Sequence, residues 1–239
     1  MNIDSDSTKN TRHLSWTGFW KKSTGSKRLF QGIADNYFDN FKLVFPLSSE
    51  TRILDFGCGH GYLAYLLADR VKNVYIHDAS PSMMEIARYA NGKKNNVIAL
   101  EKLPGNTPTM DYILANSVIQ YMTPDILKDT LRLWRTLLKD EGKIIVSDVL
   151  TENLRFFSEI LGLLTFSLSQ GYLMGQLSQL ASLLFSNYSK VARECPLTYY
   201  PHGLLRNLAT ETKLSVEILD KNLVYGRSRY SASLQKIEK

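Results

Sequence analysis

Three alternating glycines behind an acidic residue form the pattern with the clearest chemical meaning. Asp55 lies in the apolar stretch 52–56, and Gly57, Gly59 and Gly61 follow it at intervals of two residues. A glycine-rich turn between a strand and a helix lets a ligand approach the backbone and directs helix N–H groups at it. An acidic residue at this place repels a pyrophosphate and attracts an ammonium group. The pattern therefore favours a cofactor that carries an amino acid.

A nicotinamide dinucleotide fits the same segment poorly. Dinucleotide-binding turns have the spacing Gly-x-Gly-x-x-Gly, and the third glycine of that pattern is replaced here by Tyr62. A second acidic residue, Asp78, stands 17 residues after Gly61, at the expected end of the next strand. It can accept hydrogen bonds from both hydroxyls of a ribose, or it can be an acid that stabilises the start of a helix. The glycine turn upstream favours the ribose.

Strands and helices alternate along the part of the chain that must position these residues. Apolar patterns predict strands at 52–56, 74–78, 97–100, 111–115 and 143–149, and helices at 29–45, 62–70, 82–90 and 124–138. This alternation is typical of a parallel sheet covered by helices. Two final strands, 215–219 and 223–234, are separated by only three residues, so we expect them to be antiparallel.

Composition and charge narrow the class of protein further. The 239 residues carry a net charge of +6, and the segment 1–28, with six basic and two acidic residues, accounts for +4 of it. We interpret 1–28 as a flexible basic leader, because a nucleic-acid enzyme usually carries its basic stripe on the folded body. The leader lacks the apolar core of a signal peptide. Cys58 and Cys195 form no disulfide framework, so we expect a cytoplasmic location.

The segment 160–189 contains no charged residue, and its leucines recur at helical spacing on both sides of residues 169–171. We expect two helices in a hairpin within a helical cap at 152–195. The serine and glutamine content argues against a transmembrane segment. The hairpin can be extra core, a homodimer surface or the wall of a pocket for a lipophilic molecule, and these three alternatives stay open.

Several segments together resemble one family, the class I S-adenosylmethionine (SAM)-dependent methyltransferases. The matching segments are 53–61, 77–83, 103–104, 110–117 and 137–143, the last with its usual Pro-Gly replaced. The resemblance covers about residues 29–150. It implies an α/β fold with a seven-stranded, mostly parallel sheet, an antiparallel last strand, helices on both faces and a helical cap. The domain would span 29–239, with 29–45 as a lid helix.

The resemblance also implies which residues hold the cofactor, SAM. Asp55 and the turn residues Gly57, Cys58, Gly59 and Gly61 would lie at its methionyl part, which Asn116 would also face. The remaining implied contacts are the ribose for Asp78, the adenine for Ala79, Met83, Leu100 and Glu101, and a covering ring from Tyr37.

Methyl transfer from a sulfonium is an in-line displacement that needs a general base only when the acceptor is protonated. The candidates for that base are His202, Tyr121 and Asp148, while Tyr199 and Tyr200 are interpreted as pocket wall or core. No cluster has metal-ligand spacing, so no metal is predicted. The segment after the fourth strand, 116–119, lacks the Pro-Pro-aromatic pattern of enzymes that methylate DNA bases or glutamine.

The leading hypothesis is methyl transfer to O, N or C of a small, apolar metabolite, with no DNA partner. One alternative is a SAM-binding partner subunit without catalysis. The other is an RNA methyltransferase that uses the basic leader 1–28 as its RNA contact, for which no RNA-binding appendage is recognised. An NAD-dependent dehydrogenase is disfavoured by Tyr62.

Overall fold

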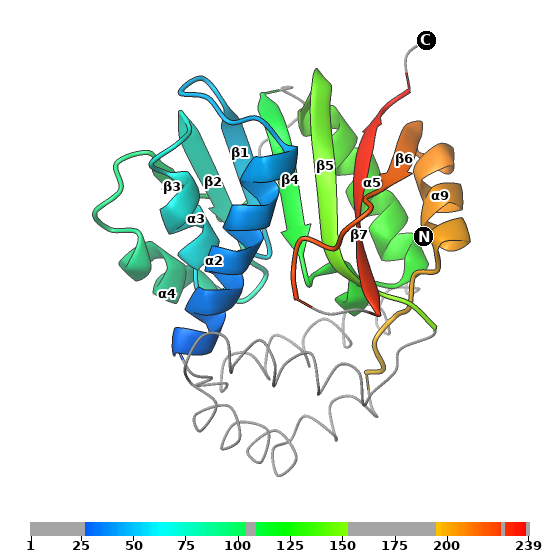
Figure 1. The fold of residues 1–239 in the computed structure, drawn as a ribbon, viewed down its shortest axis with the longest axis horizontal. Helices are drawn as coiled ribbons and strands as arrows, with labels where there is room; N and C mark the ends of the chain where they lie inside the picture. The colour runs from blue at the N-terminus through cyan, green and yellow to red at the C-terminus, as the bar shows by residue number, and fades with distance from the viewer. Residues whose placement is uncertain (1–26, 104–108, 153–194, 226–227, 238–239) are drawn as a thin grey trace, which may run out of the picture.

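Seven strands form one sheet in the order β3-β2-β1-β4-β5-β7-β6 (Figure 1). The structure, a computed structural model, describes residues 27–103, 109–152, 195–225 and 228–237. The strands are β1 (Arg52–Phe56), β2 (Asn73–His77), β3 (Val97–Ala99), β4 (Met110–Asn116), β5 (Leu138–Leu150), β6 (Leu214–Ile218) and β7 (Arg229–Lys236). Strands β1 to β5 pair in parallel, and β7 is antiparallel to both β5 and β6.

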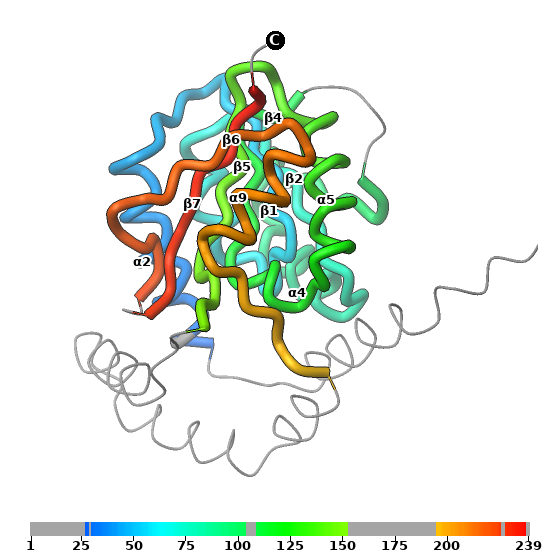
Figure 2. Tube along the Cα trace, turned by 90° about the vertical axis from the view of Figure 1, so that its right-hand side faces the viewer, coloured from blue at the N-terminus to red at the C-terminus, as the bar shows by residue number. Residues whose placement is uncertain are grey.

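Helices cover both faces of the sheet, as the side view shows (Figure 2). The helices are α2 (Lys27–Val44), α3 (Tyr62–Leu67), α4 (Pro81–Ala90), α5 (Pro124–Leu137) and α9 (His202–Glu211), with a short 3₁₀ turn, η1 (Ile119–Tyr121). Helices α2 and α3 pack on one face of the sheet and α5 and α9 on the other, and each face has its own apolar core. The sheet therefore separates the two apolar cores. The edge at which the parallel strands β1 to β5 end, its carboxyl edge, lies between these cores.

Local sequence explains where the main helices begin and which side they bury. Thr123 precedes α5, and its Oγ1 accepts a hydrogen bond from Ile126 N, while Pro124 occupies the first helical position. Along α2, Ala34, Tyr37 and Phe41 recur at helical spacing and are all buried against the sheet. These two helices thus fix the two layers on either side of β4.

The predicted fold class is confirmed. Helix α9 (His202–Glu211) was not predicted, and the other differences lie at the ends of elements. Helix α3 ends at Leu67 instead of residue 70, and β5 begins at Leu138 because that residue pairs with Met110. The last strand begins at Arg229 rather than residue 223, so this part of the prediction was wrong. Residue Leu223 leaves the sheet because its carbonyl accepts a hydrogen bond from Asn40 Nδ2 of α2.

Two predicted segments fall mostly outside the described residues. Only residues 27 and 28 of the leader 1–28 are described, and they already belong to α2. Of the helical cap 152–195, only the two end residues are described. The expectations about the leader, the hairpin and a homodimer through it therefore stay predictions.

Candidate active site

The glycine turn lies between β1 and α3 and is tied to the end of β2. Gly57 N and Cys58 N both donate hydrogen bonds to His77 O, at 2.7 and 3.2 Å. Gly57 has a φ of 75°, and a Cβ added there would lie 2.4 Å from Val118 Cγ2. This position therefore requires glycine for both its backbone and its space. Gly59 also has a positive φ but faces open space, so a ligand can approach the turn from that side.

The far end of the turn is held by α4. Asn91 Nδ2 donates a hydrogen bond to Gly61 O at 3.0 Å, and Ala87 packs where a Cβ of Gly61 would stand. Cys58 is mostly buried, and burial raises the pKa of its thiol. The thiol is therefore an apolar part of the turn and no nucleophile.

Asp78 lies between the glycine turn and the start of α4. Its carboxylate accepts hydrogen bonds from Gly59 N at 3.0 Å and from Ser80 N at 2.8 Å. The bond to Ser80 fits the role of an acid at a helix start, and the bond to Gly59 fixes the turn. Each carboxylate oxygen can accept further hydrogen bonds, so a ribose contact by Asp78 stays a prediction that this arrangement permits.

Asp55 and Asn116 lie on the same face of the sheet, beneath α2. Asp55 pairs in register with Leu114, and Asn116 follows two residues later, so both side chains point to the same side. Asp55 is 3% exposed. Among the described residues, no group donates a hydrogen bond to its Oδ2 or to the Oδ1 of Asn116, and both atoms are buried. Such oxygens are costly to leave unpaired, so this place is suited to a ligand that donates hydrogen bonds.

Burial also changes the ionisation of the acidic group. Desolvation, and secondly the charge of Asp78, raises the pKa of Asp55 to about 7. Tyr37 lies over this region from α2, is fully buried, and its hydroxyl oxygen is 3.5 Å from Ser147 Oγ. Burial raises the pKa of Tyr37, so its hydroxyl keeps its proton. The covering role of the Tyr37 ring over a cofactor stays a prediction.

The residues expected at the adenine are spread around the ends of β2 and β3. Ala79 is exposed, Met83 is buried on α4, and the Leu100 carbonyl lies 2.9 Å from His77 Nδ1. Glu101 is exposed and forms an ion pair with Arg88 at 3.2 Å.

Sequence reasoning missed the role of Met84 in the same region. Its Sδ accepts a hydrogen bond from Asp78 N at 3.1 Å, so this methionine helps to position Asp78. In the sequence, only its position next to Met83 on the predicted helix pointed to Met84. The direction of α4 decides which of the two methionines reaches Asp78.

A second polar cluster joins the carboxyl ends of β4 and β5 to the start of β7. Asp148 Oδ2 accepts a hydrogen bond from Ser117 Oγ at 2.6 Å and forms an ion pair with Arg229 Nη1 at 2.7 Å. Ser117 and Asp148 both have a left-handed backbone, with φ of 57° and 60°. The Asp148 carboxylate is therefore bound by two groups of the chain. Arg229 was not foreseen, because its pairing depends on the order of the strands.

The other candidate bases lie apart in the fold. His202 is exposed at the start of α9, and its ring packs edge-to-face on Tyr230 with 4.4 Å between ring centroids. Tyr121 is half-buried at the end of η1. Tyr200 is fully buried, and its hydroxyl donates a hydrogen bond to Met122 O. The described residues thus give Tyr200 a structural role, whereas base roles for His202, Tyr121 and Asp148 stay predictions.

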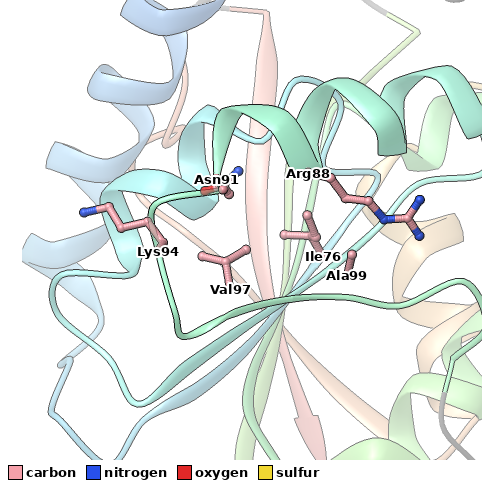
Figure 3. Close-up of a pocket in the computed structure, with 7 residues that line it drawn as sticks. Ile76, Arg88, Asn91, Lys94, Val97 and Ala99 are labelled. Carbon is pink, nitrogen blue, oxygen red and sulfur yellow. The ribbon is translucent and has the colours of Figure 1, made fainter.

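A cavity lies beside α4, and Asn91, which holds the far end of the glycine turn, is one of its lining residues (Figure 3). It is lined by residues of β2, β3 and α4, among them Arg88, Asn91 and Lys94. Both of its basic side chains are already paired, Arg88 with Glu101 and Lys94 with Asp69.

Within the residues that the structure describes, no group of three or more His, Cys, Asp and Glu side chains is placed to hold a metal ion. No helix in the described part of the chain has the length and apolar character needed to cross a membrane.

Comparison with known proteins identifies the class. Residues 53–142 match the family described as "Methyltransferase domain". An uncharacterized methyltransferase of Staphylococcus carnosus is 25% identical over 114 residues, which are 48% of this chain and 55% of the relative. A ribosomal protein L11 methyltransferase of Paraburkholderia phytofirmans is 35% identical over 108 residues, 42% of this chain and 33% of the relative.

Solved structures share the fold across nearly the whole chain. Phosphoethanolamine N-methyltransferase 1 of Haemonchus contortus, in complex with phosphoethanolamine and S-adenosylhomocysteine, has a TM-score of 0.64 at 15% identity. The alignment covers 99% of this chain and 52% of that one. Magnesium protoporphyrin IX methyltransferase of Synechocystis PCC 6803, with bound SAM, has a TM-score of 0.55 at 12% identity, covering 97% and 94%.

Residues 53–142 carry a methyltransferase domain, and the structure has the fold of the class I, SAM-dependent methyltransferases, as the sequence predicted. SAM is the cofactor of this class, and structures that share the fold hold SAM or S-adenosylhomocysteine. The sequence matches span about half of the S. carnosus relative and a third of the L11 enzyme. The described residues fit the cofactor: unpaired buried oxygens of Asp55 and Asn116 suit its ammonium group, and the turn at Gly59 is open.

Proposed function

We propose that the protein transfers a methyl group from SAM to a small acceptor molecule, at O, N or C. The observation that carries this proposal is the pair of buried, unpaired oxygens on Asp55 and Asn116, beside a glycine turn whose open side is at Gly59. The carboxyl ends of parallel strands are where α/β proteins bind ligands, and β1 and β4 both end here.

SAM supplies an electrophilic methyl group on a sulfonium, with a thioether as leaving group. The chain's own part is binding, alignment and exclusion of water. Asp55 and Asn116 would accept hydrogen bonds from the ammonium group, and Asp78 would accept them from the ribose. Helix α2 covers this region with the buried ring of Tyr37, which keeps water away from the strand ends.

A small acceptor is supported by the structural relatives, whose names specify phosphoethanolamine and magnesium protoporphyrin IX as substrates. The segment after β4, Asn116-Ser117-Val118-Ile119, lacks the pattern of enzymes that methylate DNA bases. The proposal that the acceptor is apolar depends on the charge-free segment 160–189, which lies outside the described residues. The polar cluster of Ser117, Asp148 and Arg229 borders the same edge of the sheet and would contact a polar group of the acceptor.

Calorimetric titration with S-adenosylhomocysteine and with NADH tests the cofactor. We expect the wild-type protein to bind S-adenosylhomocysteine and not NADH. In Asp78→Asn the affinity should fall at least tenfold, because an amide cannot replace a carboxylate that accepts from the turn and the ribose. The control Asp129→Asn changes an exposed carboxylate on α5 and should bind as the wild type does. Binding of NADH alone would refute the proposal.

Transfer of labelled methyl groups separates this proposal from its alternatives. A protein supplied with methyl-labelled SAM and an extract of small metabolites should form labelled products that dissolve in organic solvent. Label found only in added RNA would support the RNA methyltransferase alternative. Binding of SAM without labelled product in either fraction would favour a partner subunit without catalysis.

A further inference from the structure

Four polar side chains form a buried layer between α2 and the carboxyl ends of β1, β4 and β5. We call Tyr37, Asp55, Asn116 and Ser147 the polar layer. Asn116 pairs in register with Ser147, so the three strand residues share one face, and Tyr37 reaches Ser147 from α2. Tyr37 and Ser147 are fully buried and Asp55 nearly so. The layer lies directly above the apolar core that α2 shares with the sheet.

In the described part of the chain, the charged and titratable groups around Asp55 come from each neighbouring element and include no cation. Asp78 follows β2, Cys58 belongs to the glycine turn, and Tyr37 comes from α2. His60 interacts with Asp78, but burial lowers the pKa of its ring, so it is neutral near pH 7. Within the described residues, Asp55 therefore has a neighbouring acidic residue, Asp78, and no positively charged partner.

A buried carboxyl without a cation holds its proton more tightly than one in water, because desolvation and a nearby negative charge both disfavour the ionised form. The unpaired Oδ2 adds a third reason, since no N–H or O–H donor stabilises the negative charge there. A cationic ligand removes the last two of these conditions and offsets the first. Its N–H groups pair with the oxygens, and its charge offsets that of Asp78.

We propose that the polar layer binds the ammonium group of SAM with Asp55 ionised, so that cofactor binding releases a proton from Asp55. This inference rests on the proposed function. The O–H bond of the Asp55 carboxyl breaks, the proton passes to buffer, and the carboxylate accepts a hydrogen bond from the ammonium nitrogen. No oxidant or reductant takes part. Cofactor affinity thereby depends on pH near neutrality.

Calorimetry with S-adenosylhomocysteine, in two buffers that differ in ionisation enthalpy, measures the protons released. Because the pKa of Asp55 is about 7 in the free protein, the release should be nearly one proton at about pH 6 and should vanish above about pH 8. Affinity should rise about tenfold over the same interval. A buffer-independent heat at pH 6 in the wild-type protein would overturn the inference.

Two variants assign the proton to its residue. Asp55→Asn keeps the shape but cannot release this proton, so its affinity should be weaker at pH 8 and should lose the added pH dependence. Ionisation of the ligand's own ammonium group occurs in both proteins, so the difference between them isolates Asp55. The matched control is Asp111→Asn, which alters a partly buried carboxylate at the start of β4 that already has Lys139 as partner. The control should release as many protons as the wild type, and loss of that release would contradict the assignment.

Thermal unfolding of the ligand-free protein gives a second readout. The pKa of Asp55 is higher in the folded than in the unfolded protein, so its contribution to stability is present below about pH 4 and is lost as pH rises through 7. The melting temperature of Asp55→Asn relative to wild type should therefore increase from pH 5 to pH 8. An unchanged difference would argue against the inference. Failure to bind S-adenosylhomocysteine at any pH would refute the proposed function, whereas binding without proton release would refute only this inference.

Discussion

The two halves of the carboxyl edge of the sheet differ in whether their buried polar groups have hydrogen-bond partners. At the ends of β1 and β4, Asp55 and Asn116 keep buried oxygens that accept no hydrogen bond. At the ends of β4 and β5, the Asp148 carboxylate accepts a hydrogen bond from Ser117 and forms an ion pair with Arg229. The first half has no hydrogen-bond donor for these oxygens among the described residues, whereas the second half is held together by the chain itself. This difference supports the proposed binding of the ligand's ammonium group beside Asp55 and Asn116.

The glycine turn should give the largest effect on the first half. In Gly57→Ala the new Cβ meets Val118, and the backbone must keep a φ of 75° that disfavours alanine. We expect at least a hundredfold weaker binding of S-adenosylhomocysteine in calorimetry. Adding Val118→Ala to this variant relieves the contact but not the backbone, so it should restore binding in part. Wild-type affinity in Gly57→Ala would show that the turn is not where the cofactor binds.

Breaking the ion pair of the second half should reduce stability more than cofactor binding. Arg229→Met removes the ion pair of the buried Asp148 carboxylate, which costs about 3 kcal/mol of unfolding free energy. Chemical denaturation measures this loss, and the affinity for S-adenosylhomocysteine should change less than threefold. The double variant with Asp148→Asn should recover part of the stability, because it removes the buried negative charge. A large loss of affinity with normal stability would instead place Arg229 at the cofactor.

The smallest effect is expected at Glu101, and it sharpens the border of the cofactor site. Its carboxylate is exposed and pairs with Arg88 on the surface. Exposed pairs contribute little, so Glu101→Gln should leave stability nearly unchanged. If only backbone groups of this segment border the adenine, the affinity for S-adenosylhomocysteine should change less than twofold. A tenfold loss would show that the carboxylate itself contacts the cofactor.

The terminal strands show how far local patterns reach. Residues 223–234 were predicted as one strand, yet β7 begins only at Arg229. The earlier residues pack near α2, where Leu223 O accepts from Asn40 and Leu223 N donates to Ser231 Oγ. Strand preference depends on what a segment packs against, and that neighbour is almost two hundred residues away in the chain.

The sequence by itself determined the sheet, the glycine turn and the acidic residues at the ends of the first two strands. These features follow from local spacing: glycine where φ is positive, apolar alternation along strands, and Asp55 and Asp78 where those strands end. Only the tertiary structure decided the state of those groups. The burial of Asp55 beside Asp78 and the pairing of Asp148 with Arg229 depend on strand order and on the cover of α2. Desolvation and charge pairing act between residues distant in sequence, so no local pattern reveals them.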